Sequence, residues 1–325
     1  MTVLLTGATG FVPSNIVLAL VEAGDTVLAL DQRPPEERLL RELATLGAGK
    51  EKVDFIQGDV CDAGLIERLI SQRRPEYVVQ AAAITPTREM EEARPRQIVE
   101  VNELSLISVL ESSARHGVRR VVSFSSEAAY DQREPRPEPL DEDAPLYGGD
   151  RLYSLTKIAG EALARWARAH YGLDVRVVRP GTVYGPYERP TGARQSMSGP
   201  YRAAHLALSG ETLRPNAPDI VVSYVHARDV ASGVLAVLRT SELAHETYNL
   251  ADQPASQRQM IEAVAREVTG TKIEWVANPE QANIPLLDRP RTPIGNQRLQ
   301  ADTPWRPAYT IDSGIAQYVE WLRAG

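Results

Sequence analysis

The sequence is short of cysteine and of long hydrophobic runs. Its 325 residues include one cysteine, Cys61, which excludes an intramolecular disulfide and a site built from several thiolates. A reducing compartment, the cytoplasm, is therefore expected. No apolar run approaches the roughly 20 residues that cross a bilayer, and the first run, residues 3–5, is too short for a signal peptide. We expect no membrane partner.

An excess of positive charge is also absent. The 36 lysines and arginines face 43 acidic residues, for a net charge of −7, which argues against broad nucleic-acid binding because little is available to displace counterions from phosphates. The five histidines show no metal-ligand spacing, so no metal is expected. Small molecules remain as the expected partners.

The first half of the chain alternates short apolar runs with longer amphipathic segments. Apolar runs without polar alternation are typical of parallel strands covered on both faces, so we predict a doubly wound α/β sheet. The predicted strands are 2–6, 26–30, 52–56, 77–80, 118–124 and 173–178. The predicted helices are 11–23, 35–46, 65–73, 98–115, 153–171, 229–239, 256–269 and 312–322.

The alternation ends after residue 180. Pro, Gly and Arg are frequent over 186–218, which predicts irregular backbone over a binding site. The length of the chain suits a large α/β domain that carries a smaller one.

Two glycines stand where the first strand turns into the first helix. In the run 6–12, Thr-Gly-Ala-Thr-Gly-Phe-Val, Gly7 and Gly10 allow a pyrophosphate to approach the helix N-terminus, since neither has a Cβ. The third glycine of such a motif is replaced by Pro13, which a first helical turn tolerates. Strand before and helix after favour a dinucleotide site over a purely structural turn.

The second strand ends on an acid, Asp31. Its carboxylate can accept both ribose hydroxyls and repel a 2′-phosphate, which favours NAD over NADP. Arg33 keeps NADP open, because it could hold that phosphate. Asp59, after the third strand, is interpreted either as a contact to the adenine or as a helix N-cap.

Tyr153 and Lys157 are four residues apart in a predicted helix and therefore share one face. A tyrosine titrates near about pH 10, and a nearby ammonium favours its phenolate. Ser126 could hold the substrate hydroxyl during the proton transfer. The pair alone is common by chance, and a solvated surface pair is the alternative.

These motifs together resemble the extended short-chain dehydrogenase/reductases of the NAD-dependent epimerase/dehydratase group. The resemblance covers nearly the whole chain, and its strength lies in the order and spacing of the matching stretches. These stretches are 6–11, 58–60, 101–102, 125–126 with Tyr130, 153–157, 179–186, 224–226 with 229–230, and 248–250.

The resemblance implies a seven-stranded Rossmann domain formed by residues 1–180 and 224–252. A smaller mixed α/β substrate domain is implied for residues 181–223 and 253–325. Tyr153 becomes the acid/base, Lys157 its activator, Ser126 the hydroxyl that polarises substrate, and Asn102 a supporting polar residue. Related dehydratases carry an Asp-Glu pair after this serine; here Glu127 is followed by Ala128, so elimination and a plain solvated or turn-capping carboxylate stay open.

The expected cofactor-binding residues combine the glycine turn with the ends of later strands. They are Gly7, Thr9, Gly10, Phe11, Val12, Asp31, Asp59, Val60, Ala81, Ala82, Ala83, Tyr153, Lys157 and Pro180. The expected substrate-binding residues are Thr85, Ser126, Thr182, Val183, Arg194 and Gln195.

The substrate region lacks two contacts that many relatives use on nucleotide sugars. Val222 stands where an arginine would hold the diphosphate, and Thr182 replaces an asparagine. An uncompensated diphosphate is costly to desolvate, so a smaller sugar, sugar acid or polyol is favoured. Arg189, Arg194 or Arg202 could clamp an acidic group, although most such arginines are only solvated.

We therefore expect an NAD-dependent enzyme, a dehydrogenase that oxidises a secondary hydroxyl of a small sugar-like substrate and releases NADH. The alternative is an epimerase or dehydratase that retains its NADH and returns the hydride. A binding-only protein is a third possibility, but such relatives commonly lose the tyrosine or the lysine, which this chain keeps. The resemblance also implies a homodimer formed through helices 98–115 and 153–171.

Overall fold

The computed structural model describes residues 1–252, 254–287 and 289–325. Residues 253 and 288 fall in the segment expected to form the second domain and lie outside the described residues.

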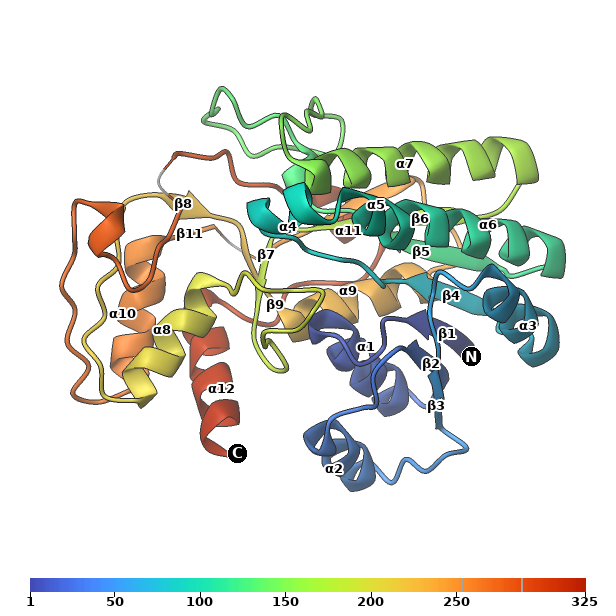
Figure 1. Ribbon diagram of the computed structural model, residues 1–325, viewed down its shortest axis with the longest axis horizontal. Coiled ribbons are helices and arrows are strands. Elements are labelled where there is room, and N and C mark those ends of the chain that lie inside the picture. Colours follow the sequence, from blue (N-terminus) through green and yellow to red (C-terminus); the bar gives the residue numbers. More distant parts are fainter. Residues whose placement is uncertain (253, 288) are drawn as a thin grey trace.

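Seven parallel strands form the central sheet, in the order β10-β6-β5-β4-β1-β2-β3 (Figure 1). This confirms the doubly wound α/β prediction. The order reverses between β1 and β4, and ligands of such sheets bind at the carboxyl ends of the strands beside that reversal. The strands are β1 (Thr2–Thr6), β2 (Thr26–Asp31), β3 (Val53–Gln57), β4 (Tyr77–Gln80), β5 (Arg120–Phe124), β6 (Val175–Pro180) and β10 (Thr247–Leu250).

Helices cover both faces of the sheet because its strands are apolar on both sides (Figure 1). One face packs against α3 (Ala63–Arg73), α6 (Ser105–His116) and α7 (Leu152–Tyr171). The other packs against α1 (Phe11–Glu22) and α9 (Ala227–Arg239), with α2 (Glu37–Thr45) and α11 (Gln297–Asp302) contributing to the same core.

The helix predicted for 98–115 is interrupted. After α4 (Arg88–Ala93) and α5 (Pro95–Val99), residues Glu100–Leu104 form a π-turn before α6 begins. In this turn the amide of Ser105 donates to the carbonyl of Glu100, five residues back. Such turns within α-helices are frequent at functional sites, and hydrophobic periodicity does not reveal them.

A smaller body holds the C-terminal part of the chain, at the left of Figure 1. Its buried core is separate from the two cores of the sheet and includes Met260, Ile261 and Tyr318. Its elements are β7 (Thr182–Tyr184) paired with β9 (Tyr224–His226), β8 (Val221–Val222) paired with β11 (Ala255–Ser256), and α8 (Gly199–Leu208), α10 (Gln257–Glu267) and α12 (Ile311–Arg323).

The expectation of irregular backbone over 186–218 is wrong for α8. Ser198 caps this helix by accepting a hydrogen bond from the amide of Tyr201, and Pro200 lies in its first turn, where its missing N–H has no intrahelical partner. Alanines on its inner face pack into the smaller core. The proline and glycine that suggested a loop mark the start of a helix instead.

Within residues 1–252, 254–287 and 289–325, no helix combines the length and apolar character needed to span a membrane.

Candidate active site

A cleft of about 1020 Å³ lies between the carboxyl ends of the strands and the smaller body. Its walls include the glycine turn after β1, the loop after β4, the end of β5, the start of α7 and the loop that leads to α8. The predicted cofactor and catalytic segments therefore meet in one cavity. Five expected residues are not among those that line it: Thr9, Asp59, Asn102, Glu127 and Gln195.

The glycine turn is built for close approach. Gly7 has φ +68°, and a Cβ on it would lie 2.8 Å from the Cα of Ala82. Gly10 donates its amide to the carbonyl of Gly7 at 2.8 Å and starts α1. The hydroxyl of Thr9 is buried without a hydrogen-bond partner among the described residues. A pyrophosphate fits this turn, because at Gly7 and Gly10 it would meet backbone rather than side-chain bulk.

Asp31 is fixed at the end of β2, in the wall of the cleft. One carboxylate oxygen accepts the amide of Thr9 at 3.1 Å, and the other accepts the amide of Arg33 at 3.0 Å. The acid is therefore aligned by backbone donors beside the glycine turn, where a ribose would lie.

Asp59 is placed differently from its expected role. Gly58 and Val60 line the cleft, whereas Asp59 accepts the amide of Cys61 at 2.8 Å. The N-cap of α3 is Asp62, which accepts the amide of Leu65. Asp59 thus stabilises the turn between β3 and α3, and the N-cap interpretation is wrong by three residues.

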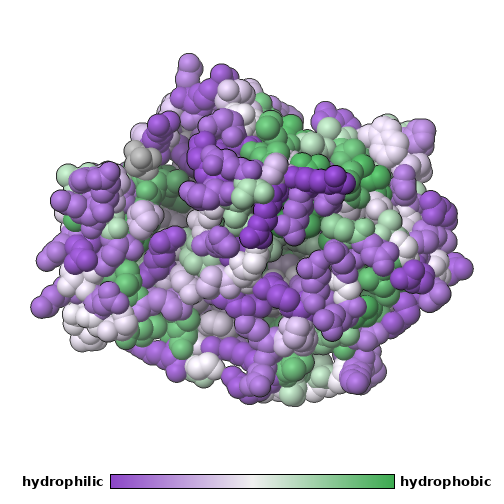
Figure 2. Space-filling model, in the orientation of Figure 1, coloured by the Kyte–Doolittle hydropathy of each residue, from purple (hydrophilic) through white to green (hydrophobic). Residues whose placement is uncertain are grey.

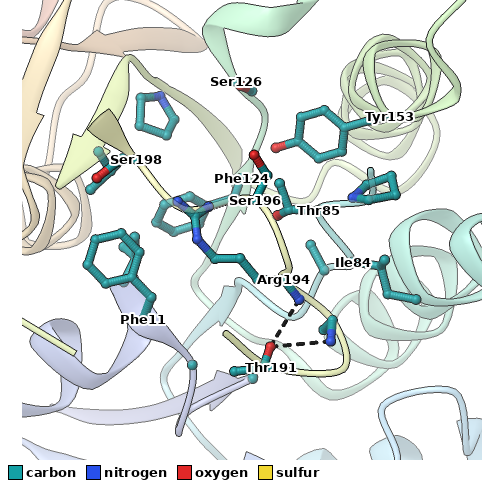
Figure 3. Close-up of a pocket in the computed structure, with 18 of the residues that line it drawn as sticks. Phe11, Ile84, Thr85, Phe124, Ser126, Tyr153, Thr191, Arg194, Ser196 and Ser198 are labelled. Carbon is teal, nitrogen blue, oxygen red and sulfur yellow. Dashed lines mark hydrogen bonds between the residues drawn. The ribbon is translucent and has the colours of Figure 1, made fainter. Parts of the chain in front are cut away.

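The catalytic candidates come from two elements. Tyr153 and Lys157 lie in the first turns of α7, and Ser126 follows β5. Lys157 is 7% exposed, and its ammonium donates to the carbonyl of Phe124 at 2.9 Å and lies 5.5 Å from the centre of the Tyr153 ring. Figure 3 shows the Tyr153 hydroxyl directed into the space between Ser126 and Thr85. Tyr153, Lys157 and Ser126 therefore border the same cleft, as a proton transfer with one substrate hydroxyl would require.

Asn102 supports this arrangement from behind. On the π-turn, its side-chain oxygen accepts the amide of Ile84 at 2.8 Å, and its amide donates to the carbonyl of Ile84 and to the hydroxyl of Thr156, both at 3.1 Å. It thereby ties the loop after β4, which carries Thr85, to α7.

Glu127 neither caps a turn nor simply faces water. It starts a short 3-10 helix (Glu127–Ala129), and its carboxylate accepts the hydroxyl of Thr182 at 2.9 Å. Burial raises its pKa, while Arg291 and the Thr182 hydroxyl act in the opposite direction. Sequence reasoning missed Arg291, which also lines the cleft. No motif marks it, because it reaches the site from a loop far along the chain.

The arginines of the loop before α8 are held by the fold. Arg194 pairs with Glu188 at 2.6 Å, and Glu188 also accepts the amide and hydroxyl of Ser198. In Figure 3 the Arg194 side chain crosses the cleft toward Phe11, and its guanidinium lies 5.3 Å from that ring. Arg189 instead donates to the carbonyl of Thr9 at 2.7 Å. Both arginines line the cleft, and their positions are fixed by these contacts.

His226 lies outside the cleft lining and is fully buried at the N-terminus of α9. Burial lowers its pKa to about 3, so the ring is neutral at physiological pH. This agrees with a structural histidine. Within the described residues, no group of three or more His, Cys, Asp or Glu side chains is arranged to hold a metal ion.

The family model for the NAD dependent epimerase/dehydratase family matches residues 3–251. The chain belongs to this family. It is 27% identical to a dTDP-glucose 4,6-dehydratase of Xanthomonas campestris, over 98% of this chain and 92% of the relative. It is 28% identical to a UDP-glucose 4-epimerase of Mycolicibacterium smegmatis, over 99% of both chains.

Solved structures agree with this assignment. The UDP-glucose 4-epimerase of Thermus thermophilus in complex with NAD superimposes with a TM-score of 0.81 at 26% identity, over 100% of each chain. The protein is accordingly an NAD-dependent enzyme. The glycine turn and Asp31 would hold the adenosine and pyrophosphate half of the cofactor, and Lys157 would lie near its nicotinamide half. The cofactor supplies the hydride acceptor.

Proposed function

We propose that this enzyme oxidises a secondary hydroxyl of an anionic, nucleotide-linked sugar and later returns the hydride, as an epimerase or dehydratase. The observation that carries the proposal is that Tyr153, Lys157 and Ser126 line one cleft, with the ammonium of Lys157 5.5 Å from the centre of the Tyr153 ring. The similarity to nucleotide-sugar epimerases and dehydratases over almost the whole chain supports hydride return over net oxidation.

In the proposed reaction Tyr153 takes the proton of the sugar hydroxyl while the carbon-bound hydrogen leaves as hydride. The ammonium of Lys157, a buried residue, stabilises the phenolate form, since it lies 5.5 Å from the centre of the Tyr153 ring. Ser126 donates to the same sugar oxygen, where negative charge develops. When the hydride returns, Tyr153 gives the proton back.

The charge of the cleft supports an anionic substrate. The protein carries a net charge of −7, yet Asp31 is the acid among the described residues that line the cleft. The cations that line it are Arg33, Arg94, Arg151, Lys157, Arg189, Arg194 and Arg291. Three of the arginines are ion-paired within the fold. Even so, such a surface attracts phosphate and carboxylate groups.

Valine at position 222, in place of an arginine that would hold a diphosphate, does not by itself exclude a nucleotide-linked sugar. Val222 does line the cleft, but Arg291 lines the same cavity. Its positive charge is near enough to Glu127 to lower the pKa of that carboxyl. A cation from a different segment is thus available to an anionic group. Net oxidation of a small sugar acid remains the second candidate, favoured by Val222 and Thr182.

The experiment separates these candidates by the fate of the hydride. Purified enzyme is incubated with UDP-glucose, dTDP-glucose, UDP-glucuronate and the free sugars, and products are followed by mass and NMR together with NADH absorbance. We expect an altered nucleotide sugar without accumulated NADH, and retention of deuterium placed on the oxidised carbon. Stoichiometric NADH from a free sugar alone would refute the proposal.

Tyr153→Phe tests the assignment of the base. It removes one hydroxyl and keeps the ring, so we expect loss of turnover by about 10²-fold or more with NAD binding close to that of the wild type. Tyr147→Phe is the matched control, because Tyr147 is exposed on the preceding loop. A fully active Tyr153→Phe enzyme contradicts the assignment.

We also propose a cytoplasmic homodimer. Leu104, Leu155 and Trp166 are exposed apolar side chains at the start of α6 and along α7. Figure 2 shows hydrophobic surface over this part of the molecule, at the upper right. A second copy would cover it. Light scattering of the wild type and of Trp166→Glu checks this, and a monomeric wild type contradicts it.

A further inference from the structure

Glu103 is a buried carboxyl that the proposed reaction does not use. It lies on the π-turn and is 7% exposed. Its neighbour Asn102 is satisfied by Ile84 and Thr156, whereas Oε2 of Glu103 has no hydrogen-bond partner among the described residues. A buried polar atom without a partner costs stability, so its presence requires an explanation.

Glu103 shares a small internal cavity with Lys157. The cavity measures about 10 Å³, close to the space that one water requires. It lies between the π-turn, α7 and the strands β4 and β5, behind the large cleft. Lys157 uses one of its three ammonium hydrogens on Phe124, so others are available to a water that bridges to Glu103. The remaining polar residues around the cavity are Gln80, Asn102, Ser123, Ser125, Thr156 and Glu161.

Lys157 and Glu161 are the charged groups that face Glu103 in this cavity, both from α7. Glu161 is matched by Arg179 of β6 through two hydrogen bonds of 2.7 and 2.6 Å. Burial raises the pKa of Glu103 to about 8, and the charge of Lys157 acts in the opposite direction. Glu103 is therefore mostly neutral at neutral pH and ionised at alkaline pH.

We propose that Glu103 is a positioning residue that acts through Lys157 by holding its ammonium form at alkaline pH. An ammonium withdrawn from water loses hydration, which favours the neutral amine, and a carboxylate in the same cavity offsets that loss. At neutral pH the carboxyl of Glu103 is uncharged. It therefore does not weaken the electrostatic stabilisation that the ammonium of Lys157 gives to the phenolate of Tyr153. The inference rests on the proposed function, in which Tyr153 is the acid/base.

The first test compares pH profiles of the rate of NADH formation in single turnovers for the wild type and Glu103→Gln. We expect equal rates at neutral pH and an alkaline decline that begins at lower pH in the variant than in the wild type. Glu103→Asp, which retains the charge, should restore part of the difference. Glu111→Gln, on the exposed face of α6, should leave the profile unchanged. The inference is overturned if the wild type and Glu103→Gln lose activity over the same alkaline pH range. It is also overturned if the variant is slower by the same factor at every pH.

The second test needs no turnover. The infrared difference between the wild type and Glu103→Gln isolates the carboxyl band of Glu103, which we expect to disappear with a midpoint of about pH 8. In Lys157→Met the midpoint should move to higher pH, because the opposing charge is gone. An unmoved midpoint overturns the inference. A moved midpoint in an enzyme that turns over no sugar supports the coupling and counts against the proposed reaction alone.

Discussion

The ion pair between Glu161 and Arg179 offers a stringent test of how this site is built. Their side chains are 6% and 4% exposed, and Glu161 also accepts the hydroxyl of Ser125, the neighbour of Ser126. Arg179 is further held by the hydroxyl of Tyr130 and the carbonyl of Glu142. The guanidinium therefore has no route to water when its partner is removed.

Glu161→Gln leaves that guanidinium buried without its hydrogen-bonded counter-charge. Removing one partner of a buried pair costs about 3 to 5 kcal/mol, and we expect the free energy of unfolding to fall by this amount. The measurement is urea unfolding followed by circular dichroism, with NAD absent from all samples. The amide of the variant replaces one carboxylate oxygen by a donor, so the hydrogen bonds to Ser125 and Arg179 cannot all be kept. The position of Ser126 and the rate of sugar oxidation should therefore suffer as well.

Two further variants test whether the unpaired guanidinium causes the loss of stability. Glu161→Gln combined with Arg179→Met removes the unpaired positive charge and should recover much of the lost stability. A double-mutant cycle of the wild type, the two single variants and the double variant should therefore give a large coupling energy. Glu100→Gln breaks an exposed pair, in which the Arg96 side chain is 90% exposed, and should cost less than about 1 kcal/mol. If Glu161→Gln costs no more than Glu100→Gln, the buried pair does not stabilise the site as argued.

Two other predictions follow from the backbone and from a buried acid pair. Gly7→Ala places a Cβ 2.8 Å from the Cα of Ala82 at φ +68°, so NAD affinity measured by calorimetry should fall at least tenfold, and unchanged affinity contradicts the close-approach argument. Burial and the neighbouring Asp229 raise the pKa of Asp252, so the folded state binds this proton more tightly than the unfolded chain and loses stability as pH rises from acidic to alkaline. Asp252→Asn should therefore raise the thermal midpoint more at about pH 9 than at about pH 5; an equal gain at both excludes this explanation.

Much of the sheet was predictable because its strands are buried on both faces and read as continuous apolar runs. The expected strand 77–80 matches β4, and 2–6 matches β1. β10 has the sequence Thr-Tyr-Asn-Leu, whose polar residues weaken the apolar signal; the sequence alone did not predict it as a strand. Its Asn249 is satisfied by Tyr130 and Leu140, contacts between segments far apart in the chain.

The site was predictable where its residues are linked by local spacing and not where they meet through tertiary contacts. Tyr153 and Lys157 share a helical face, and Gly7 and Gly10 share a turn. Arg291 and Glu103 carry no such signature. Arg291 reaches the cleft from a distant loop, and Glu103 is turned inward at a π-turn that hydrophobic periodicity cannot register.

The chain returns to its first domain with α9 and β10, so this domain is completed late in synthesis. α9 packs along α1, whose Phe11, Ile16, Val17 and Leu20 are buried, and it is followed by the edge strand β10, which pairs with β6. The helix behind the dinucleotide turn therefore lacks its cover until more than two hundred further residues have left the ribosome. We expect nascent chains of intermediate length to expose that apolar helix and to depend on chaperones, and a fragment ended after β6 to aggregate rather than to bind NAD.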